Sequence, residues 1–190
     1  MSLGTLYILP GSSRNSWLPG LVKYLGLDVK VVSIRDIDNY KSIFPLGKAP
    51  AFEATNGFKV TEVAAVVEYL ILQSAKPELL GSTKEEKVSN TRWFSFTNTD
   101  VGNTMVAWNR RPQDSPEEVA TRKENVHNLF KYLNNHFASS KYVVGDNITV
   151  ADLYLYTDVT KINANGIPLD GYPHLEKYIS TVSVHPALSG

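Results

Sequence analysis

The chain has 190 residues, of which 43% are apolar, and a formal net charge of zero from 19 basic and 19 acidic residues. This length and apolar content allow one large domain or two small domains, each with a real core. Because the charges balance and no basic run appears, the composition excludes the strongly charged classes of nucleic-acid-binding and membrane-surface proteins. The pair Arg110–Arg111 is too short to indicate RNA binding.

The chain contains no cysteine, which excludes disulfides, thiolate metal sites and cysteine nucleophiles. No apolar run is long enough to span a bilayer, and the first residues lack the pattern of a signal peptide. We therefore expect a cytoplasmic protein that binds no membrane. The histidines show no metal-ligand spacing, so we predict no metal site and interpret all four as structural or exposed: His127, His136, His174 and His185.

The first 43 residues predict a strand, a helix, a second strand and a second helix. Residues 5–9 are typical of a buried strand, and residues 28–33 of another. Between them a helix is expected from about residue 15 to residue 25. Pro19–Gly20 lies inside it, and because proline inside a helix costs about 3 kcal/mol, we expect an irregular first turn or a helix start near Pro19. A short helix is expected over residues 34–43.

The stretch from Leu46 to Leu70 organises the rest of the chain. Asn56–Gly57 separates two β-prone segments and predicts a tight hairpin. Pro50 cannot donate to a sheet, so we expect it at the start of the hairpin, where a cis bond after Ala49 leaves the preceding backbone free to bind a peptide-like ligand. A helix that opens at Thr61–Glu62 places its positive end a few residues from that edge.

This order of elements is typical of a thioredoxin-like α/β domain, which we place at residues 1–75. A polar connector follows. The remainder, residues 83–190, predicts an all-α domain with one brief strand at residues 142–144. Its helices are expected at 84–108, at 117–137 behind Ser115 and Pro116, after Thr149, and at 172–182.

Residues Thr149 and Asp152 form a second helix-start pattern. Thr149 can cap the following helix, while Asp152 can bond back to the chain that enters it. This acidic variant of the capping box contributes about 1 kcal/mol. We therefore predict a structural capping role for both residues.

The proline, the hairpin and the acidic helix start resemble the glutathione-binding half of the glutathione transferase superfamily, and the Thr149–Asp152 box resembles the folding motif of its helical second domain. Ala49–Pro50 matches the cis-proline element, and Glu62 matches the acid of the family's acid–serine pair. Val63 stands where the family has serine, whose hydroxyl helps to hold the glutamyl carboxylate of glutathione. Loss of one charge-assisted hydrogen bond costs on the order of 1.5–3 kcal/mol, although the backbone N–H of Val63 remains.

Several segments resemble more closely the N-terminal domain of the fungal gamma subunit of elongation factor one-B: TLYI, LDVKVV, FPLGKAPAF and RWFSFTNTD. This resemblance implies an interaction module of translation elongation that binds the nucleotide-exchange subunit or an aminoacyl-tRNA synthetase. It also implies a homodimer packed along the first long helix of the second domain. The gamma subunit continues into a Lys-rich linker and a second conserved domain that these residues do not contain. We favour this function because Val63 replaces the family serine and the first helix is disturbed.

The alternative is a cytosolic glutathione transferase, an enzyme without a bound cofactor that uses glutathione as its co-substrate. The resemblance then places the catalytic hydroxyl in the turn after the first strand, at Ser12 or at the adjacent Ser13, where it stabilises the thiolate of glutathione. The same residues are also usual choices for a plain turn and helix cap. Lys48 could neutralise a carboxylate of the ligand or lie in solvent, and Glu62 could contact an ammonium group of the ligand or stabilise the helix start.

Two further candidates are predicted to be structural. Tyr7 is the place to look for the catalytic tyrosine of other transferase classes, but its position within a strand favours the core. Arg92–Trp93 could line a cleft between the domains or fill the domain interface, and because large aromatic side chains usually belong to a core, we expect packing.

Overall fold

The computed structural model describes residues 2–108 and 114–189, and the chain divides into two compact units. Unit 1 comprises residues 1–78 together with 185–190, and unit 2 comprises residues 79–184. The predicted boundaries near 75 and 83 lie on either side of this division. The C-terminus differs from the prediction, because the chain from residue 185 onward belongs to unit 1 and not to the helical unit.

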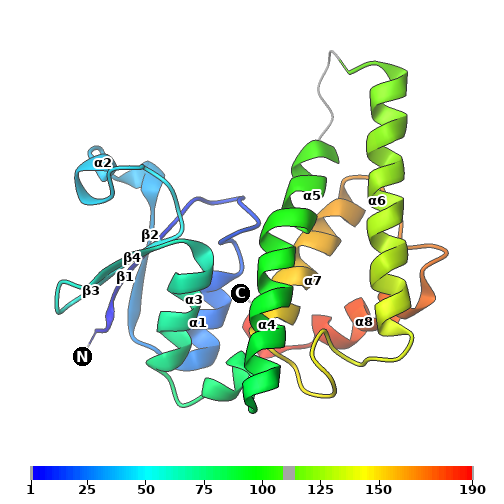
Figure 1. Ribbon diagram of the computed structural model, residues 1–190. Helices are drawn as coiled ribbons and strands as arrows, with labels where there is room; N and C mark the ends of the chain where they lie inside the picture. Colours follow the sequence, from blue (N-terminus) through cyan, green and yellow to red (C-terminus); the bar gives the residue numbers. More distant parts are fainter. Residues whose placement is uncertain (1, 109–113, 190) are drawn as a thin grey trace. The chain divides into compact units, whose positions relative to one another are not determined.

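Four strands of unit 1 form one sheet in the order β2-β1-β3-β4: β1 Gly4–Ile8, β2 Val29–Ser33, β3 Ala51–Ala54 and β4 Lys59–Thr61 (Figure 1). β1 and β2 are parallel, whereas β3 is antiparallel to both β1 and β4. The β3–β4 hairpin turns at Asn56–Gly57 as predicted, and the side chain of Asn56 accepts a 3.0 Å hydrogen bond from the amide of Phe58. The predicted thioredoxin-like arrangement is confirmed.

The helical segments of unit 1 are α1 Leu18–Leu25, η1 Ile34–Asp36, α2 Tyr40–Ile43, α3 Val63–Leu72 and η4 Pro186–Leu188, and η2 Pro77–Leu80 lies at the boundary with unit 2. α1 begins at Leu18 with Pro19 in its first turn, which is one of the two predicted alternatives. The predicted helix over residues 34–43 is wrong in extent, because it forms two short pieces. The backbone of Ile37, directly after η1, is extended and separates η1 from α2.

The two faces of the sheet bury different side chains, because successive residues of a strand point to opposite sides. Leu6 and Phe52 pair across the sheet and are fully buried, and the ring of Phe52 lies 5.4 Å from that of Tyr69 on α3. On the other face, the ring of Tyr7 lies 5.6 Å from that of Tyr40 on α2. α3, with α1 beside it, therefore covers one face, and α2 covers the other (Figure 1).

The C-terminal segment of unit 1 explains the glycine at position 20, inside α1. η4 packs on α1, where Gly20 lies against the carbonyl group of Ala187 and leaves no room for a side chain. The ring of His185 lies 4.6 Å from that of Tyr24, and the ammonium group of Lys76 lies 4.4 Å from the centre of the Tyr24 ring. The glycine is therefore required by a contact with the far end of the sequence.

Unit 2 is all-α, as predicted, with the segments α4 Lys84–Phe96, η3 Thr97–Val101, α5 Gly102–Trp108, α6 Pro116–Phe137, α7 Val150–Ala164 and α8 Pro173–Ser183. The predicted helix over residues 84–108 is interrupted by η3, a turn of π-helix. Within the residues that the structure describes, unit 2 has no strand. The predicted strand at 142–144 is wrong, because the amide of Val143 donates to the side chain of Asp152 at 2.8 Å instead of joining a ladder.

α7 lies at the centre of unit 2 and contacts α4, α5 and α8 (Figure 1). Consecutive residues of this helix are buried, including Leu153, Tyr154 and Leu155. A helix that is buried around its circumference must have neighbours on all sides, which is the position of a core helix. Among the described helices, none combines the length and the apolar character that crossing a membrane requires.

Candidate functional site

The strand register of unit 1 brings three segments to the same end of the sheet. Tyr7 pairs with Ala51, so the turn after β1 lies beside the start of β3. Ala51 also pairs with Thr61, which places the start of α3 at the same end. We call the predicted site residues on these segments the sheet-end site: Ser12, Ser13, Lys48, Ala49, Pro50, Glu62 and Val63.

The backbone that enters β3 is held in place at the sheet-end site. The Ala49–Pro50 peptide bond is cis, as predicted, and Pro50 directly precedes β3. The hydroxyl of Tyr40 donates a 2.9 Å hydrogen bond to the carbonyl of Lys48, whose side chain is exposed. Burial raises the pKa of Tyr40 to about 12, with a smaller contribution from Tyr7 nearby. The phenol therefore remains a hydrogen-bond donor at neutral pH and fixes the chain before Pro50.

α3 begins with an unsatisfied helix start. Glu62 is its N-cap residue, with φ 68° and ψ 129°, and it is the one non-glycine residue with a positive φ in the described ranges. Such backbone conformations cost about 1–3 kcal/mol and concentrate at functional sites. The carboxylate of Glu62 is exposed and makes no capping hydrogen bond, and the amides of Val63 and Ala64 donate to no acceptor in the described part of the chain. These amides can therefore receive an anionic group.

The side chain of Val63 belongs to the core. It is 3% exposed, so the isopropyl group offers no polar contact at the helix start. In the family that the sequence resembles, a serine hydroxyl occupies this position. Here the backbone N–H of Val63 is what remains for a ligand.

The turn after β1 is built around Asn15, a residue that the sequence analysis did not single out. Asn15 is fully buried, and its side-chain oxygen accepts a 3.0 Å hydrogen bond from the amide of Leu9, which closes the turn. Its side-chain nitrogen has no hydrogen-bond partner within the described residues. The signal was present in the sequence, because asparagine side chains commonly bond to the backbone of turns.

The two predicted serines lie on this turn. The carbonyl of Ser12 accepts a 2.8 Å hydrogen bond from the amide of Ser16. The residue Ser12 is half-buried, and Ser13 is 6% exposed. Neither of these two serine hydroxyls forms a hydrogen bond within the described ranges. The N-cap of α1 is Trp17, without a side-chain capping bond. The two serines therefore form the turn but do not cap the helix.

Tyr7 and Trp93 are core residues, as predicted, whereas the neighbouring Arg92 is exposed. Tyr7 is 7% exposed in the core, and its hydroxyl donates a 3.2 Å hydrogen bond to the carboxylate of Glu53. The guanidinium group of Arg92 lies 4.3 Å from the centre of the Trp93 ring and donates a 2.6 Å hydrogen bond to the hydroxyl of Tyr132. Both residues are engaged within their own units.

Asp152 is the centre of a buried hydrogen-bond network in unit 2. Its Oδ1 accepts hydrogen bonds from the amide of Val143 at 2.8 Å and from the hydroxyl of Tyr178 at 3.1 Å. Its Oδ2 accepts hydrogen bonds from the amide and the hydroxyl of Thr149 at 2.8 and 3.0 Å. Burial raises the pKa of Asp152 to about 6, although these hydrogen bonds act in the opposite direction. The network fixes the start of α7 to α8, which fits the predicted structural role of Thr149 and Asp152.

No group of histidine and acidic side chains in the described residues is arranged to hold a metal ion. His127 has a structural partner, since its Nδ1 lies 2.8 Å from the hydroxyl of Tyr172. The ring of His136 lies 4.5 Å from that of Trp93. Arg110–Arg111 lies outside the described residues.

Comparisons with known proteins agree with this geometry. Residues 2–71 match the family described as "Glutathione S-transferase, N-terminal domain", and residues 83–186 match "Glutathione S-transferase, C-terminal domain". Glutathione S-transferase Y-2 of Pichia kudriavzevii is 33% identical over 99% of this chain and 98% of its own length. Elongation factor 1-gamma 2 of Saccharomyces cerevisiae is 31% identical over 98% of this chain but 48% of its own length.

A solved structure gives the same result in three dimensions. The crystal structure of a glutathione S-transferase from Pichia kudriavzevii (Issatchenkia orientalis) matches with a TM-score of 0.87 and 42% identity, over 100% of this chain and 95% of that one. Together, the two family matches cover both units and most of the chain. The chain therefore belongs to the glutathione S-transferase family.

Proposed function

We propose that this chain binds glutathione at the sheet-end site and conjugates its thiolate to small electrophiles. The observation that carries the proposal is the register that sets the Ala49–Pro50 edge beside the open start of α3. An extended peptide ligand can pair with the backbone at that edge, while the amides of Val63 and Ala64 receive one of its carboxylates. The match with a glutathione S-transferase over nearly the whole length of that relative supports the same function.

The hydroxyl of Ser12 supplies the catalytic hydrogen bond in this proposal. It donates to the sulfur of glutathione and favours thiolate over thiol, and lowering the thiol pKa by about 2 units requires about 2.7 kcal/mol. The thiolate then forms a carbon–sulfur bond to the electrophile, the leaving group departs with its bonding electron pair, and the thiol proton passes to solvent. Ser13, which is more deeply buried, is the second candidate for this hydrogen bond.

Retention on glutathione-agarose and conjugation of chloro-dinitrobenzene test this proposal. We expect the wild type to be retained, and we expect turnover to fall by at least about tenfold in Ser12→Ala. Ser13→Ala, measured in parallel, decides which hydroxyl acts. Ser180→Ala is the control, because Ser180 is exposed on α8 in unit 2 and should leave turnover unchanged. A wild type that is neither retained nor active overturns the proposal.

A second candidate function is an interaction module of the elongation factor one-B complex. Two observations favour it: Val63 lacks the hydroxyl of the family serine, and elongation factor 1-gamma 2 is 31% identical over 98% of this chain. The match with elongation factor 1-gamma 2 covers 48% of that protein's length. The match with glutathione S-transferase Y-2 covers 98% of that protein's length. We therefore rank the transferase first, which reverses the order of the two sequence-based hypotheses.

Co-elution in size-exclusion chromatography tests the second function. The purified chain is mixed with a purified nucleotide-exchange subunit or with an aminoacyl-tRNA synthetase. A stable complex with either protein supports the interaction module. Separate elution from both partners at micromolar concentrations removes its basis and leaves the transferase proposal unaffected.

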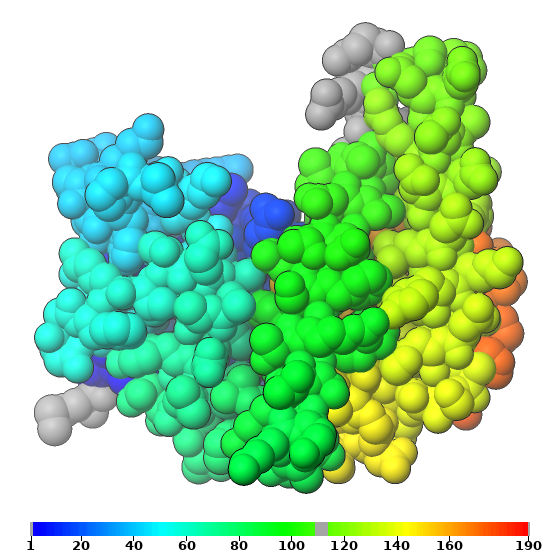
Figure 2. Space-filling view, viewed as in Figure 1, coloured from blue at the N-terminus to red at the C-terminus, as the bar shows by residue number. Residues whose placement is uncertain are grey.

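We further propose that the chain forms a homodimer through the outer face of α4. Val88 on this helix is 70% exposed, although valine is an apolar residue, and Figure 2 shows the surface of α4, in green, on the visible face of unit 2. In a twofold contact along α4, Val88 of each copy would be removed from water. Light scattering during size-exclusion chromatography should give twice the chain mass for the wild type and the chain mass for Val88→Lys. A wild type of single-chain mass contradicts the dimer.

A further inference from the structure

We propose that Asn15 is a positioning residue for the thiolate chemistry: when glutathione is bound, its side-chain N–H donates to the hydroxyl oxygen of Ser12 and so directs the hydroxyl proton to the sulfur. The role assigned to Asn15 rests on the proposed function, and it selects Ser12 over Ser13 as the hydroxyl that stabilises the thiolate. Because Asn15 is fully buried, it acts through Ser12 and touches neither glutathione nor the electrophile.

The turn after β1 places Ser12 and Asn15 on the same face. The carbonyl of Ser12 accepts hydrogen bonds from the amides of Asn15 at 3.2 Å and Ser16 at 2.8 Å. Bonds to the third and fourth residues along the chain are those of a single helical turn. In such a turn, side chains three positions apart are neighbours, whereas side chains two positions apart are not. Asn15 is three positions from Ser12 and two positions from Ser13, so it shares a face with Ser12.

The side-chain amide of Asn15 has one bonded end and one open end. Its Oδ1 accepts the amide of Leu9 at 3.0 Å, and this bond identifies the oxygen, because a backbone N–H requires an acceptor. Nδ2, the other end, has no hydrogen-bond partner in residues 2–108 and 114–189. A buried donor without an acceptor costs free energy, and the cost is removed when an acceptor arrives.

The hydroxyl of Ser12 can supply this acceptor. It forms no hydrogen bond within the described residues, and rotation about χ1 moves its oxygen while the backbone stays in place. A hydroxyl has one proton and two lone pairs, so it can accept from Asn15 and donate to a sulfur at the same time. Accepting the first bond polarises the hydroxyl and strengthens the second. Two hydrogen bonds in series therefore connect Asn15, through Ser12, to the thiolate.

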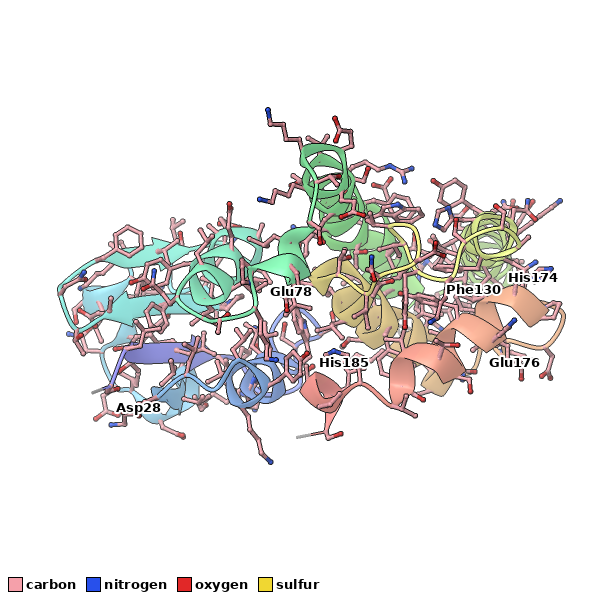
Figure 3. The ribbon with its side chains drawn as sticks, turned by 90° about the horizontal axis from the view of Figure 1, so that it is seen from below. Asp28, Glu78, Phe130, His174, Glu176 and His185 are labelled. Atoms are coloured by element: carbon pink, nitrogen blue, oxygen red, sulfur yellow. The ribbon has the colours of Figure 1, made fainter. Side chains whose placement is uncertain are left out.

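The backbone of this turn is fixed on both sides. The amide of Ser12 donates to the carbonyl of Leu9 at 3.1 Å, directly after β1, which ends at Ile8 in the sheet. On the other side, η4, which follows His185 (labelled in Figure 3), packs on α1. Side-chain rotation is then the movement that aligns the two groups, which suits a preorganised catalytic hydrogen bond.

The pKa of the thiol of bound glutathione tests this role, measured by the ultraviolet absorbance of the thiolate in a pH titration. In the wild type it should lie about 2 units below the pKa of free glutathione, and Ser12→Ala should restore most of that difference. Asn15→Ala should raise the pKa by about 1 unit, a tenfold loss of thiolate at lower pH. In the Ser12→Ala background, the same substitution should have no effect, because Asn15 acts through that hydroxyl.

Asn15→Asp repeats the test with the turn preserved, in case Asn15→Ala does not fold. Aspartate keeps an acceptor for the amide of Leu9 but replaces the donor toward Ser12 by a second acceptor. Its charge also raises the thiol pKa directly, and this part of the shift persists without Ser12. The total shift should therefore be larger by at least about 1 unit when Ser12 is present.

Asn90→Ala is the matched control. Asn90 lies in unit 2 and is 4% exposed, and its Oδ1 accepts the amide of Ala151 at 3.2 Å, as Oδ1 of Asn15 accepts that of Leu9. Both alanine variants should lower the midpoint of thermal unfolding, because each leaves a backbone amide without its acceptor. Only Asn15→Ala should change the thiol pKa.

The outcomes separate the two proposals. A wild type that does not lower the thiol pKa overturns the proposed function and the role of Asn15 together. If Ser12→Ala raises the pKa but both Asn15 variants have the same effect with and without Ser12, the role of Asn15 alone is overturned. Coupling of the Asn15 variants to Ser13→Ala instead of Ser12→Ala overturns the choice of hydroxyl.

Discussion

The starts of α7 and α3 each carry an acidic residue, and they differ in almost every other respect. At the start of α7, the carboxylate of Asp152 is fully buried and accepts hydrogen bonds from Val143, Thr149 and Tyr178. At the start of α3, the carboxylate of Glu62 is exposed and makes no capping bond, and its backbone has a positive φ. One start is satisfied internally, and the other is open.

This difference separates a structural element from a ligand site. The α7 start stabilises the fold, and the carboxylate of Asp152 and the amides of Ala151 and Asp152 all have partners within unit 2. The α3 start leaves the amides of Val63 and Ala64 available, and the conformation of Glu62 has a cost in folding free energy. An acidic residue near a helix start does not by itself indicate function; the unsatisfied donors beside it do.

The largest effect is expected at the satisfied start. Asp152→Ala removes the acceptor of several buried donors and should lower the free energy of unfolding by about 3–5 kcal/mol. Ser115→Ala is the control, because Ser115 starts the exposed capping box of α6 and should cost about 1 kcal/mol. Chemical denaturation measures both variants. Equal losses would contradict the distinction between a buried and an exposed start.

The pH dependence of stability gives the next effect. Burial raises the pKa of Asp152 in the folded state from its ordinary value of 3.8 to about 6, so the folded state binds an extra proton between these values. This stabilisation is complete below about pH 4 and is lost as the pH rises through about 6, by roughly 2–3 kcal/mol. Asp152→Asn should not show this change.

The measurement is the difference in unfolding free energy between wild type and Asp152→Asn from about pH 4 to about pH 7. Burial lowers the pKa values of His136 and His185, so the stability that these groups contribute is lost as the pH falls through their unfolded value. Both histidines are common to the two proteins, and their effect cancels in the difference. A difference that does not vary with pH disproves the assignment to Asp152.

Val63→Ser tests the open start directly. The new hydroxyl should add a hydrogen bond to a bound carboxylate and raise the affinity for glutathione by about tenfold. Replacing a buried isopropyl group should also lower the free energy of unfolding by about 1–2 kcal/mol. Val66→Ser, a fully buried control one turn later, should lose stability without gaining affinity in isothermal titration calorimetry. A Val63→Ser variant with unchanged affinity would argue against a carboxylate at this helix start.

The smallest effect is expected for Tyr40, whose hydroxyl holds the backbone of Lys48 at the sheet-end site. Tyr40→Phe removes the donor to the carbonyl of Lys48 and should lower the free energy of unfolding by about 0.5–1.5 kcal/mol. It should also weaken glutathione binding several-fold, because the chain before Pro50 loses its anchor. Tyr7→Phe removes a hydroxyl bonded to Glu53 instead and should cost similar stability with no change in affinity. Equal glutathione affinities in the two variants would rule out the anchoring role of Tyr40.

The features that the sequence predicts well have local causes. Asn56–Gly57 closes its hairpin with bonds between near neighbours, and Ser115 starts α6 through reciprocal bonds with Glu118. Hydrophobic periodicity gives the order of the elements, and that order is sufficient for the thioredoxin-like domain. Once the strands pair, the register brings Ser12, Pro50 and Glu62 to the same end of the sheet.

The features that the sequence does not predict depend on tertiary contacts. The anchoring of the Lys48 carbonyl by Tyr40 requires α2 to pack on the sheet, and the closure of the β1 turn by Asn15 requires the path of that turn. Residues 142–144 have strand propensity, but the carboxylate of Asp152 takes the amide of Val143. Periodicity alone contains none of this information.

The contact between Gly20 and Ala187 also constrains how the chain is made. A ribosome delivers residues 1–78 first, yet the segment that covers α1 is delivered after the whole of unit 2. Throughout that interval the nascent unit 1 lacks η4, the segment that packs on α1. The completion of unit 1 therefore waits for the synthesis of residues 185–190.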